Sequence, residues 1–259
     1  MKSFLTLILF LSTIFSYESP YLNWNELEKI ENAEFLVTYP KSGTNWTVCI
    51  LQILAGRQIQ WATASSIEDN LLIHNRLRVP LNLTKPPIYR DHCPSVDYYN
   101  IDQSKNKLVV LLRNYKECIV RNLYITEKEL VKEITSDQKH FSLYISNLNL
   151  YHNWKDENTK LLIYYEDLIQ KPRQTIEKLL AFLEEPLDGL EDFFDNYDYW
   201  KNKAISSYKR QYGHNISSGG QKEIHHSKDF SIQSLHKIDQ HIQETYPELW
   251  ENYLSRYAS

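Results

Sequence analysis

Three short runs of apolar residues divide the chain and predict buried β-strands. They are Phe35–Tyr39 (FLVTY), Leu108–Leu112 (LVVLL) and Leu161–Tyr165 (LLIYY). None of them alternates strictly between apolar and polar residues, and a continuous apolar run is typical of a strand that is buried on both faces. Such strands belong to parallel sheets that helices cover on each side. We therefore expect an α/β fold, a three-layer sandwich with a central parallel sheet flanked by helices.

Between and after these runs the apolar residues recur with the period of helices. Residues 46–54 (WTVCILQIL) are apolar nearly all round, which indicates a central buried helix. A second helix is expected to begin at Pro172, and a third after Ser231, which suits an N-cap. Their predicted buried stripes are Ile176, Leu179, Leu180 and Leu183 in the second helix, and Ile232, Leu235, Ile238 and Ile242 in the third.

Composition narrows the class of protein. At 259 residues, 42% of them hydrophobic and 24% charged, the chain has a size that commonly forms one α/β domain. The net charge of −4 gives no broad basic surface, so no nucleic acid is expected as a partner. The cysteines Cys49, Cys93 and Cys118 lack the spacing of zinc ligands and are predicted to be small buried hydrophobes. No metal site is expected.

An uncharged apolar segment near the start of the chain predicts export. Lys2 precedes Phe4–Phe15 (FLTLILFLSTIF), which is shorter than the ~20 residues of a membrane span but suits the core of a secretory signal. We expect a signal peptide over residues 1–16, a folded domain over residues 17–259, and no membrane span in the mature chain. The expected destination is the secretory pathway, the periplasm or the exterior. A buried N-terminal helix or an unprocessed anchor is the alternative, and the chain stays in the cytoplasm if the segment is not a functional signal.

A loop with the chemistry of an anion site follows the first predicted strand. It reads Lys41-Ser42-Gly43-Thr44 and leads into the first predicted helix. Gly43 would let the backbone approach an anion, the helix would point its first N–H groups at that anion, and Lys41 would add a full charge. An ordinary strand-to-helix turn would leave this cluster unexplained. The lysine precedes the glycine, so the loop is not the Walker sequence G-x-x-x-x-G-K-[ST].

Polar residues also lie at the ends of the other strands, at the edge where open α/β sheets bind ligands. Arg113 directly follows the second strand, and Arg121 lies on the next predicted helix. Either guanidinium could bind a phosphate. For Arg121 the alternative interpretation is an ordinary surface arginine. Tyr165 could face a purine ring or fill the core. His92, within Ile88–Pro94 (IYRDHCP), could act as a base toward a hydroxyl, although a lone loop histidine is more often structural.

Four motifs in order resemble the sulfotransferases that use 3′-phosphoadenosine 5′-phosphosulfate. TYPKSGTNW (residues 38–46) is similar to the 5′-phosphosulfate loop of that family, T-Y-P-K-S-G-T-T-W. RDHCP (90–94), VVLLRNYKECIVRN (109–122) and YYEDLIQKP (164–172) resemble its basic-x-H-x-P segment, its 3′-phosphate motif and its Y-E-D-x-x-x-x-P stretch. The resemblance implies a P-loop-like fold related to nucleotide kinases, with 3′-phosphoadenosine 5′-phosphosulfate as donor and no metal.

The resemblance also implies a role for each residue. Lys41 would stabilise charge on the departing phosphate, and His92 would take the proton of a hydroxyl or amine acceptor. The donor contacts would come from Lys41, Ser42, Gly43, Thr44, Asn45 and Trp46 at the 5′ group, Arg113 at the 3′-phosphate and Tyr165 at adenine. Sulfuryl transfer needs this combination of in-line positioning, a base on the attacking oxygen and cations at the leaving group.

Three positions depart from the pattern of the family. Asn45 replaces its second threonine, and Arg121 stands where it has serine, so that Arg121 either supplies a stronger phosphate contact or fills the pocket. The sequence ISSGGQKE replaces a basic R-K-G triplet, for which Lys222 and the backbone of Gly219 and Gly220 are candidate substitutes.

The sequence leaves alternatives open for the reaction and for the acceptor. A nucleotide or small-molecule kinase on the related fold, and a non-catalytic nucleotide- or glycan-binding protein, are the competing functions. Residues 197–212 (YDYWKNKAISSYKRQY) read most simply as a solvated loop, with a lid over the acceptor as the alternative. Aromatic residues there suit a small-molecule, lipid or carbohydrate acceptor alike.

Overall fold

The computed structural model describes residues 31–62, 77, 79–82, 84–92, 101–212 and 226–259. Several predictions fall outside these residues. They are the signal peptide over residues 1–16, the burial of Cys93, and the donor contacts from Gly219, Gly220 and Lys222.

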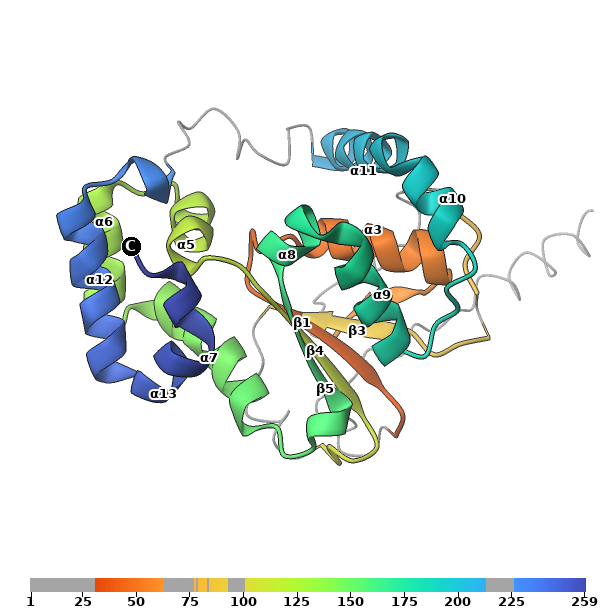
Figure 1. Ribbon diagram of the computed structural model, residues 1–259, viewed down its shortest axis with the longest axis horizontal. Coiled ribbons are helices and arrows are strands. Elements are labelled where there is room, and N and C mark those ends of the chain that lie inside the picture. Colours follow the sequence, from red (N-terminus) through yellow and green to blue (C-terminus); the bar gives the residue numbers. More distant parts are fainter. Residues whose placement is uncertain (1–30, 63–76, 78, 83, 93–100, 213–225) are drawn as a thin grey trace, which may run out of the picture.

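A parallel sheet forms the centre of the molecule (Figure 1). The described strands are β1 (Glu34–Thr38), β2 (Ile59–Trp61), β3 (Ile88–Asp91), β4 (Lys107–Leu112) and β5 (Lys160–Tyr164), in the spatial order β2-β3-β1-β4-β5. All four neighbouring pairs are parallel. The three apolar runs are thereby confirmed as the neighbours β1, β4 and β5. Strands β1 and β5 each begin and end one residue earlier than their runs, and Tyr165 opens a helix instead of ending its strand.

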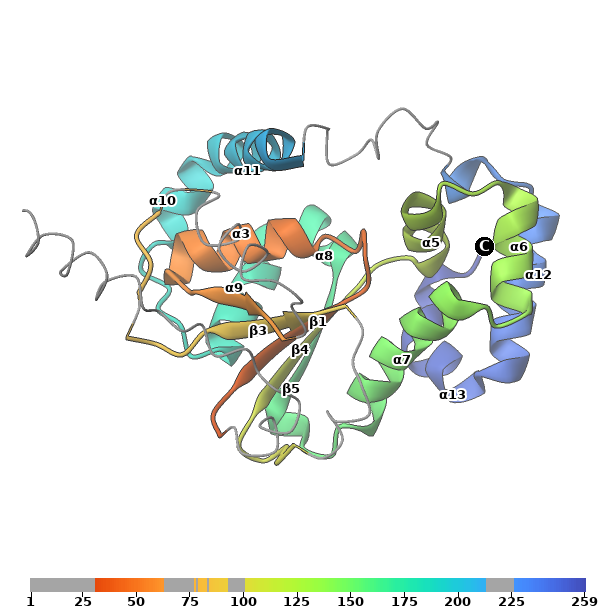
Figure 2. The same ribbon diagram turned by 180° about the vertical axis from the view of Figure 1, so that it is seen from behind.

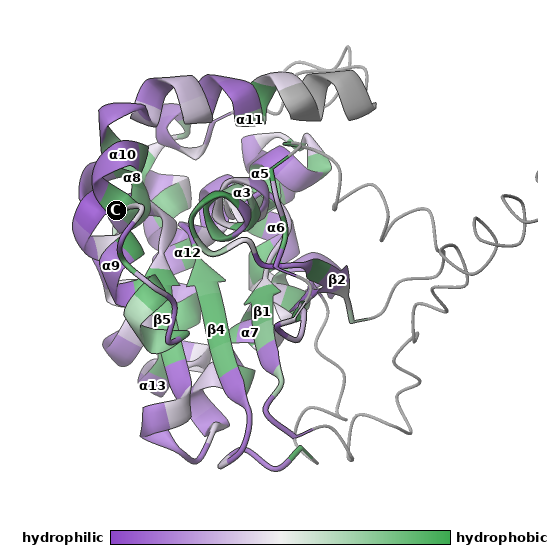
Figure 3. Ribbon diagram, turned by 90° about the vertical axis from the view of Figure 1, so that its right-hand side faces the viewer, coloured by the Kyte–Doolittle hydropathy of each residue, from purple (hydrophilic) through white to green (hydrophobic). Residues whose placement is uncertain are grey.

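Alternate side chains of the strands pack into two hydrophobic cores, one on each face of the sheet. Val37 and Val110 pack into the first core, whereas Leu36, Leu111 and Ile163 pack into the second. The first core is covered by α5 (Tyr115–Leu123), α6 (Glu127–Thr135), α7 (Lys139–Asn153), α12 (Ile232–Thr245) and α13 (Pro247–Leu249). The second is covered by α3 (Thr44–Ala55), α8 (Tyr165–Gln170), α9 (Pro172–Phe182) and α10 (Leu190–Asp195). These layers confirm the expected three-layer α/β fold (Figure 2, Figure 3).

Short helical turns complete the fold. They are η2 (Glu157–Thr159), η3 (Ser227–Asp229), the π-helical turn η4 (Trp250–Leu254) and η5 (Ser255–Tyr257). Helix α9 begins at Pro172 and its expected stripe is buried, which confirms that prediction. Helix α12 follows the N-cap Ser231, also as predicted, but only Ile238 and Ile242 of its stripe are fully buried, and Ile232 is 55% exposed. The apolar face of α12 therefore meets the core only beyond its first turn.

Residues 197–212 form helix α11 (Tyr197–Tyr212), so the expectation of a solvated loop is wrong. The segment contains no glycine or proline that would interrupt a helix. Ala204 of α11 packs with Cys49 of α3 in a small separate core, and the Tyr197 ring meets the Trp46 ring edge-on at 5.7 Å. Helix α11 therefore lies over α3, beside the loop predicted to bind an anion (Figure 1).

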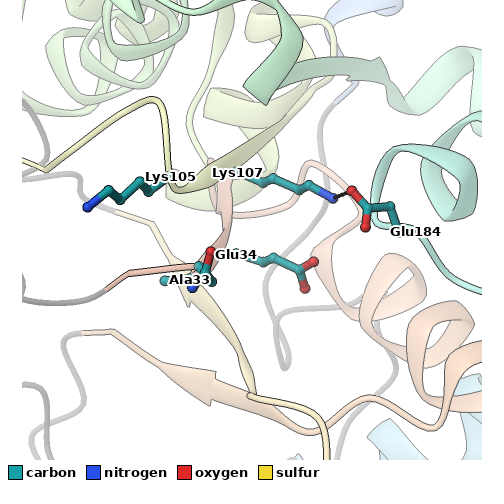
Figure 4. A pocket seen from close by; sticks show the side chains of 6 residues that line it. Ala33, Glu34, Lys105, Lys107 and Glu184 are labelled. Carbon is teal, nitrogen blue, oxygen red and sulfur yellow. Dashed lines mark hydrogen bonds and ion pairs between the residues drawn. The ribbon is translucent and has the colours of Figure 1, made fainter.

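A polar pocket lies at the amino ends of β1 and β4, opposite the predicted ligand edge (Figure 4). Its lining residues are Asn32, Ala33, Glu34, Lys105, Lys107 and Glu184. Lys107 pairs with Glu184 at 2.6 Å, and Glu34 pairs with buried Arg57 at 2.5 Å. Lys105 pairs with Glu31 at 2.6 Å. Because each charge already has a partner of opposite sign, this pocket does not suit an anionic ligand.

Candidate active site

The carboxyl ends of four strands bring the predicted site residues to one edge of the sheet (Figure 1). Strand β1 ends at Thr38 and continues into the loop over residues 39–43. Strand β3 ends directly before His92, β4 directly before Arg113, and β5 directly before Tyr165. Segments that are far apart in the sequence therefore meet around one loop.

The loop after β1 turns through two left-handed residues, Lys41 with φ 69° and Gly43 with φ 103°. Ser42 lies between them and is fully buried. Its hydroxyl donates to the Tyr39 carbonyl at 2.6 Å and its backbone N–H donates to the same oxygen at 3.1 Å, which closes the turn. Helix α3 begins at Thr44. A tight left-handed turn at a helix N-terminus directs backbone N–H groups to one side, an arrangement that binds anions.

Tyr165 and Arg113 support this loop from the neighbouring strands. A Cβ atom added to Gly43 would lie 2.3 Å from Cδ2 of Tyr165, so only glycine allows the ring this close to the loop. The Arg113 guanidinium covers the same ring at 4.5 Å from its centroid. Its Nη1 donates to the Lys41 carbonyl at 3.0 Å. Arg113 and Tyr165 together hold the loop in its left-handed conformation.

We expect Gly43→Ala to lower the free energy of unfolding by about 2–4 kcal/mol, because the left-handed backbone costs about 1–2 kcal/mol and relieving the overlap with Tyr165 costs more. Urea unfolding measures this difference. Gly189→Ala is the matched control: Gly189 has φ −86°, and its added Cβ would meet nothing nearer than Leu54 Cδ2 at 3.7 Å. A Gly43→Ala protein as stable as the Gly189→Ala protein would contradict this description of the loop.

His92 is tied to the same loop through Thr38. Its Nδ1 lies 2.8 Å from the Thr38 carbonyl oxygen and 2.9 Å from Thr38 Oγ1. A carbonyl oxygen only accepts, so Nδ1 carries the hydrogen of the neutral ring and Nε2 keeps the lone pair. Thr44 Oγ1 donates to Thr38 Oγ1 at 2.8 Å. The end of β1, the start of α3 and the histidine are thus joined by hydrogen bonds.

Burial, reinforced by the positive charge of Arg90, lowers the pKa of His92 to about 4, against the opposing effect of its hydrogen bond to Thr38. Arg90 Nη2 lies 3.5 Å from His92 Nε2. The imidazole is therefore uncharged at neutral pH. A neutral ring with its lone pair on Nε2 is the form that a general base requires.

Glu117 lies between two of the predicted site residues, Arg113 and Arg121, although the motifs gave it no role. Its Oε1 lies 3.8 Å from Arg113 Nη2 and 3.6 Å from Arg121 Nη1, one helical turn away on either side. The other partners are His226 Nδ1, at 2.9 Å from Oε1, and the N–H and hydroxyl of Ser227, both at 3.1 Å from Oε2. Burial acts to raise the pKa of Glu117, but these hydrogen bonds and the two arginines lower it overall. Glu117 is therefore ionised at neutral pH.

The predicted cations gather beside the loop. Lys41 is half-buried, and its burial together with the charge of Arg121 lowers the pKa of its ammonium group. Asn122, which follows Arg121 on α5, donates to the Tyr39 hydroxyl at 3.4 Å, so this turn of the helix rests against the loop. The side chain of Arg121 is only 18% exposed. Arg121 is therefore mostly buried beside the loop, and not the exposed surface arginine of the alternative interpretation.

Three loop residues expected to touch the donor direct their side chains into the protein. Ser42 uses both its hydroxyl and its backbone N–H within the loop, as described above. Thr44 uses its hydroxyl there and can offer its backbone N–H, at the start of α3, to an anion. The Trp46 indole stacks on Phe193 of α10 at a centroid distance of 6.3 Å. Asn45, on the first turn of α3, is partly exposed at the loop.

The two acidic residues after Tyr165 serve the fold. Glu166 accepts hydrogen bonds from the Asn114 N–H at 3.0 Å and from the Tyr257 hydroxyl at 2.8 Å, which ties the start of α5 to the end of the chain. Asp167 pairs with Arg256 at 3.0 Å. This part of the fourth motif therefore positions α5, and with it the arginines, without facing the site.

Within the described ranges, no group of three or more His, Cys, Asp and Glu residues could hold a metal ion. Cys49 and Cys118 are buried free thiols, as predicted. None of the helices in the part of the chain that the structure describes is long and apolar enough to cross a membrane.

The family model of the sulfotransferase domain matches residues 32–250. The chain belongs to the sulfotransferase family. This sulfotransferase is 25% identical over 203 residues to an amine sulfotransferase of Oryctolagus cuniculus, and 26% identical over 192 residues to a 3-beta-hydroxysteroid sulfotransferase of Cavia porcellus. The alignments cover 68% and 66% of this chain, and 66% and 67% of those relatives. The chain thus spans about two thirds of the curated relatives it matches.

Solved structures show the same fold. A mouse sulfotransferase complexed with PAP (3′-phosphoadenosine 5′-phosphate) superimposes with a TM-score of 0.60 at 16% identity, over 93% of this chain and 94% of that one. A retinol dehydratase in complex with androsterone and PAP gives a TM-score of 0.59 at 12% identity, over 89% and 86% of the two chains. These likenesses confirm the architecture of the sulfotransferase domain.

The comparisons correct the prediction of export. The curated relatives that the sulfotransferase matches are of the cytosolic type, so the expectation of a secretory, periplasmic or extracellular destination is wrong. Its physical basis was the apolar run before residue 17, which composition alone does not distinguish from other apolar segments.

Proposed function

We propose that this protein transfers a sulfuryl group from 3′-phosphoadenosine 5′-phosphosulfate to a hydroxyl or amine of a small molecule. The observation that carries the proposal is the convergence of a neutral histidine, His92, with three cations around one anion-binding loop. Family membership supports the reaction class. The relatives named for amines and for hydroxysteroids support a small-molecule acceptor over a lipid surface or a polysaccharide.

The donor would occupy the edge of the sheet above the loop. Backbone N–H groups where the loop passes into α3, those of Gly43, Thr44 and Asn45, would receive its 5′ group. Arg113 and Arg121 would form the cationic side that receives the 3′-phosphate. Tyr165 supplies ring surface beside the loop, on which the adenosine can rest. The solved neighbours complexed with PAP support a donor of this type.

The reaction would use His92 and Lys41 on opposite sides of the transferred group. His92 Nε2 would take the proton of the acceptor as its oxygen or nitrogen bonds to sulfur. The bond between sulfur and the bridging oxygen of the 5′-phosphate would break, and Lys41 would stabilise the negative charge that develops on that phosphate. The left-handed turn at Lys41 and the bond from Arg113 fix the start of the lysine side chain for this role.

The proposed donor can be tested by titration calorimetry of the full chain. We expect PAP to bind with a Kd on the order of micromolar, which corresponds to about 8 kcal/mol. Magnesium and ATP should bind more weakly, and EDTA should leave the binding of PAP unchanged, because no described carboxylate cluster could hold a metal. Tight binding of magnesium–ATP without binding of PAP would contradict the proposal and favour a phosphoryl-transfer enzyme.

A further inference from the structure

Residues Arg256–Ser259 form a strap that lies across the first turns of α8 and α5 and against α12 (Figure 1). Arg256 donates to both carboxylate oxygens of Asp167 on α8, at 3.0 and 3.2 Å. At the other end of the strap, the Ser259 N–H donates to Asp239 of α12 at 2.7 Å. Helix α8 covers one face of the sheet, whereas α5 and α12 cover the other. The strap therefore connects helices from the two outer layers.

A buried lysine of α5 depends on the strap. Lys116 is 2% exposed, and its ammonium group carries three N–H donors. One points to Asp239 Oδ1 at 2.7 Å, and the others donate to the Tyr257 carbonyl at 2.8 Å and to the Ser259 hydroxyl at 2.6 Å. Two of the three acceptors thus belong to the strap. If the strap left its place, a buried cation would lose most of its hydrogen bonds, which is strongly unfavourable.

Tyr257 connects the strap to both segments that support the loop after β1. Its ring is buried, and its hydroxyl donates to Glu166 Oε2 at 2.8 Å. The other carboxylate oxygen of Glu166 accepts from the Asn114 N–H at 3.0 Å. Glu166 directly follows Tyr165, and Asn114 directly follows Arg113. The strap is therefore bonded to the neighbours of the two residues that hold the loop.

We propose that docking of the strap is coupled to donor binding: the loop after β1 keeps its anion-binding conformation only while the strap is docked, and a bound donor in turn holds the strap in place. This coupling rests on the proposed function, because the ligand is that donor. Arg113 donates to the Lys41 carbonyl at 3.0 Å, and the Tyr165 ring lies against Gly43, so a shift of either side chain moves the loop. The strap acts through these two residues as a positioning element.

Coupling between two sites is reciprocal. If loss of the strap weakens donor binding by a given factor, saturating donor must lower the fraction of undocked strap by the same factor. Couplings of this kind commonly amount to about 5- to 150-fold. The affinity for PAP without the strap, and the accessibility of the strap with and without PAP, should therefore give the same factor.

The first measurement uses the full chain and carboxypeptidase Y, which removes residues one at a time from the C-terminus. Release of Tyr257 requires its buried ring to leave the protein and its hydroxyl to leave Glu166, so the rate of release reports the undocked fraction. Saturating PAP is expected to slow this release by about tenfold or more, as followed by mass spectrometry. Adenosine at the same concentration lacks the phosphate that the loop would receive, so it should slow the release by less than about twofold.

The second measurement is titration calorimetry of PAP with a protein that ends at Ser255. Its Kd for PAP is expected to rise by the factor found for the release of Tyr257, about tenfold or more. Circular dichroism shows whether this shortened protein is folded. If it is not, the release measured on the full chain decides alone.

Two single substitutions separate the strap from its surroundings. Tyr257→Phe keeps the ring but loses the bond to the charged Glu166, so release at this position should be about 10- to 100-fold faster, and PAP should still slow it. Tyr253→Phe is the matched control, because the Tyr253 hydroxyl lies outside the strap, 3.2 Å from Nδ1 of His152 on α7. It should change neither the rate of release nor the Kd for PAP.

Release of Tyr257 at the same rate with and without saturating PAP would overturn the coupling. A folded protein ending at Ser255 that binds PAP as tightly as the full chain would overturn it too. Failure of the proposed function is a different result, because the full chain itself would then not bind PAP.

Discussion

Replacing His92 by asparagine is expected to lower kcat by about 10²- to 10⁴-fold, the usual contribution of a general base, while the Kd for PAP changes by less than about twofold. The asparagine amide can still donate a hydrogen bond toward the Thr38 carbonyl, so the loop keeps its shape. What is lost is the lone pair of Nε2. Turnover is measured with 3′-phosphoadenosine 5′-phosphosulfate and whichever amine, hydroxysteroid or phenol is the best acceptor.

The pH profile provides a second readout of the same histidine. Because the pKa of His92 is lowered to about 4, the ring is neutral above about pH 5. On the acid side, wild-type activity should fall only as the pH drops through about 4 and the base becomes protonated.

His236→Ala, which removes an exposed histidine of α12, is the control for His92→Asn and should keep full turnover. If His92→Asn turned over as fast as the wild type while still binding PAP, His92 would take no part in the chemistry.

Lys41→Met is expected to lower kcat by about 10²- to 10³-fold, the range seen when one group that stabilises developing charge is removed. Methionine is unbranched like lysine and faces the same left-handed backbone at φ 69°, so the change removes charge with little added strain. The Kd for PAP should rise less than kcat falls, because the charge on the leaving phosphate is largest in the transition state. Comparing kcat with the calorimetric Kd separates the two effects.

Lys105→Met is the matched control for this prediction. Lys105 lies at the opposite, amino-terminal edge of the sheet, where its side chain is 48% exposed and paired with Glu31. Its replacement should leave both kcat and Kd unchanged. A parallel loss of PAP affinity and kcat in Lys41→Met would instead assign Lys41 to ground-state binding of the donor.

The sequence alone predicted the strands that are buried on both faces, and it predicted the loop between the first of these strands and α3. It did not place β2 or β3 among the strands of the sheet, because three- and four-residue strands containing Gln60 and Arg90 show no continuous apolar run. Helix α11 was mistaken for a loop because its tyrosines and lysines carry little periodic signal. Its helical form depends on packing against α3, a tertiary contact.

Tertiary contacts also limited what the sequence could predict about the site. The order of the motifs placed four residues at one edge of the sheet, because each of them directly follows a strand or lies in the loop after one. They are Lys41, His92, Arg113 and Tyr165. The roles of Thr38 and Glu117 could not be read in this way. Thr38 matters because β3 brings His92 against it, and Glu117 because Ser227, distant in sequence, closes over it. Both roles depend on pairings between distant segments.

The central claim, transfer of a sulfuryl group by His92 and Lys41 at this loop, is tested most directly by following ³⁵S from 3′-phosphoadenosine 5′-phosphosulfate into a panel of amines, hydroxysteroids and phenols with the full chain and with His92→Asn. The account predicts labelled product from at least one acceptor with the wild-type protein, without added metal, and a loss of about 10²-fold or more in the variant. Equal labelling by both proteins, or no labelled product from any acceptor with a folded wild type that binds PAP, would contradict it.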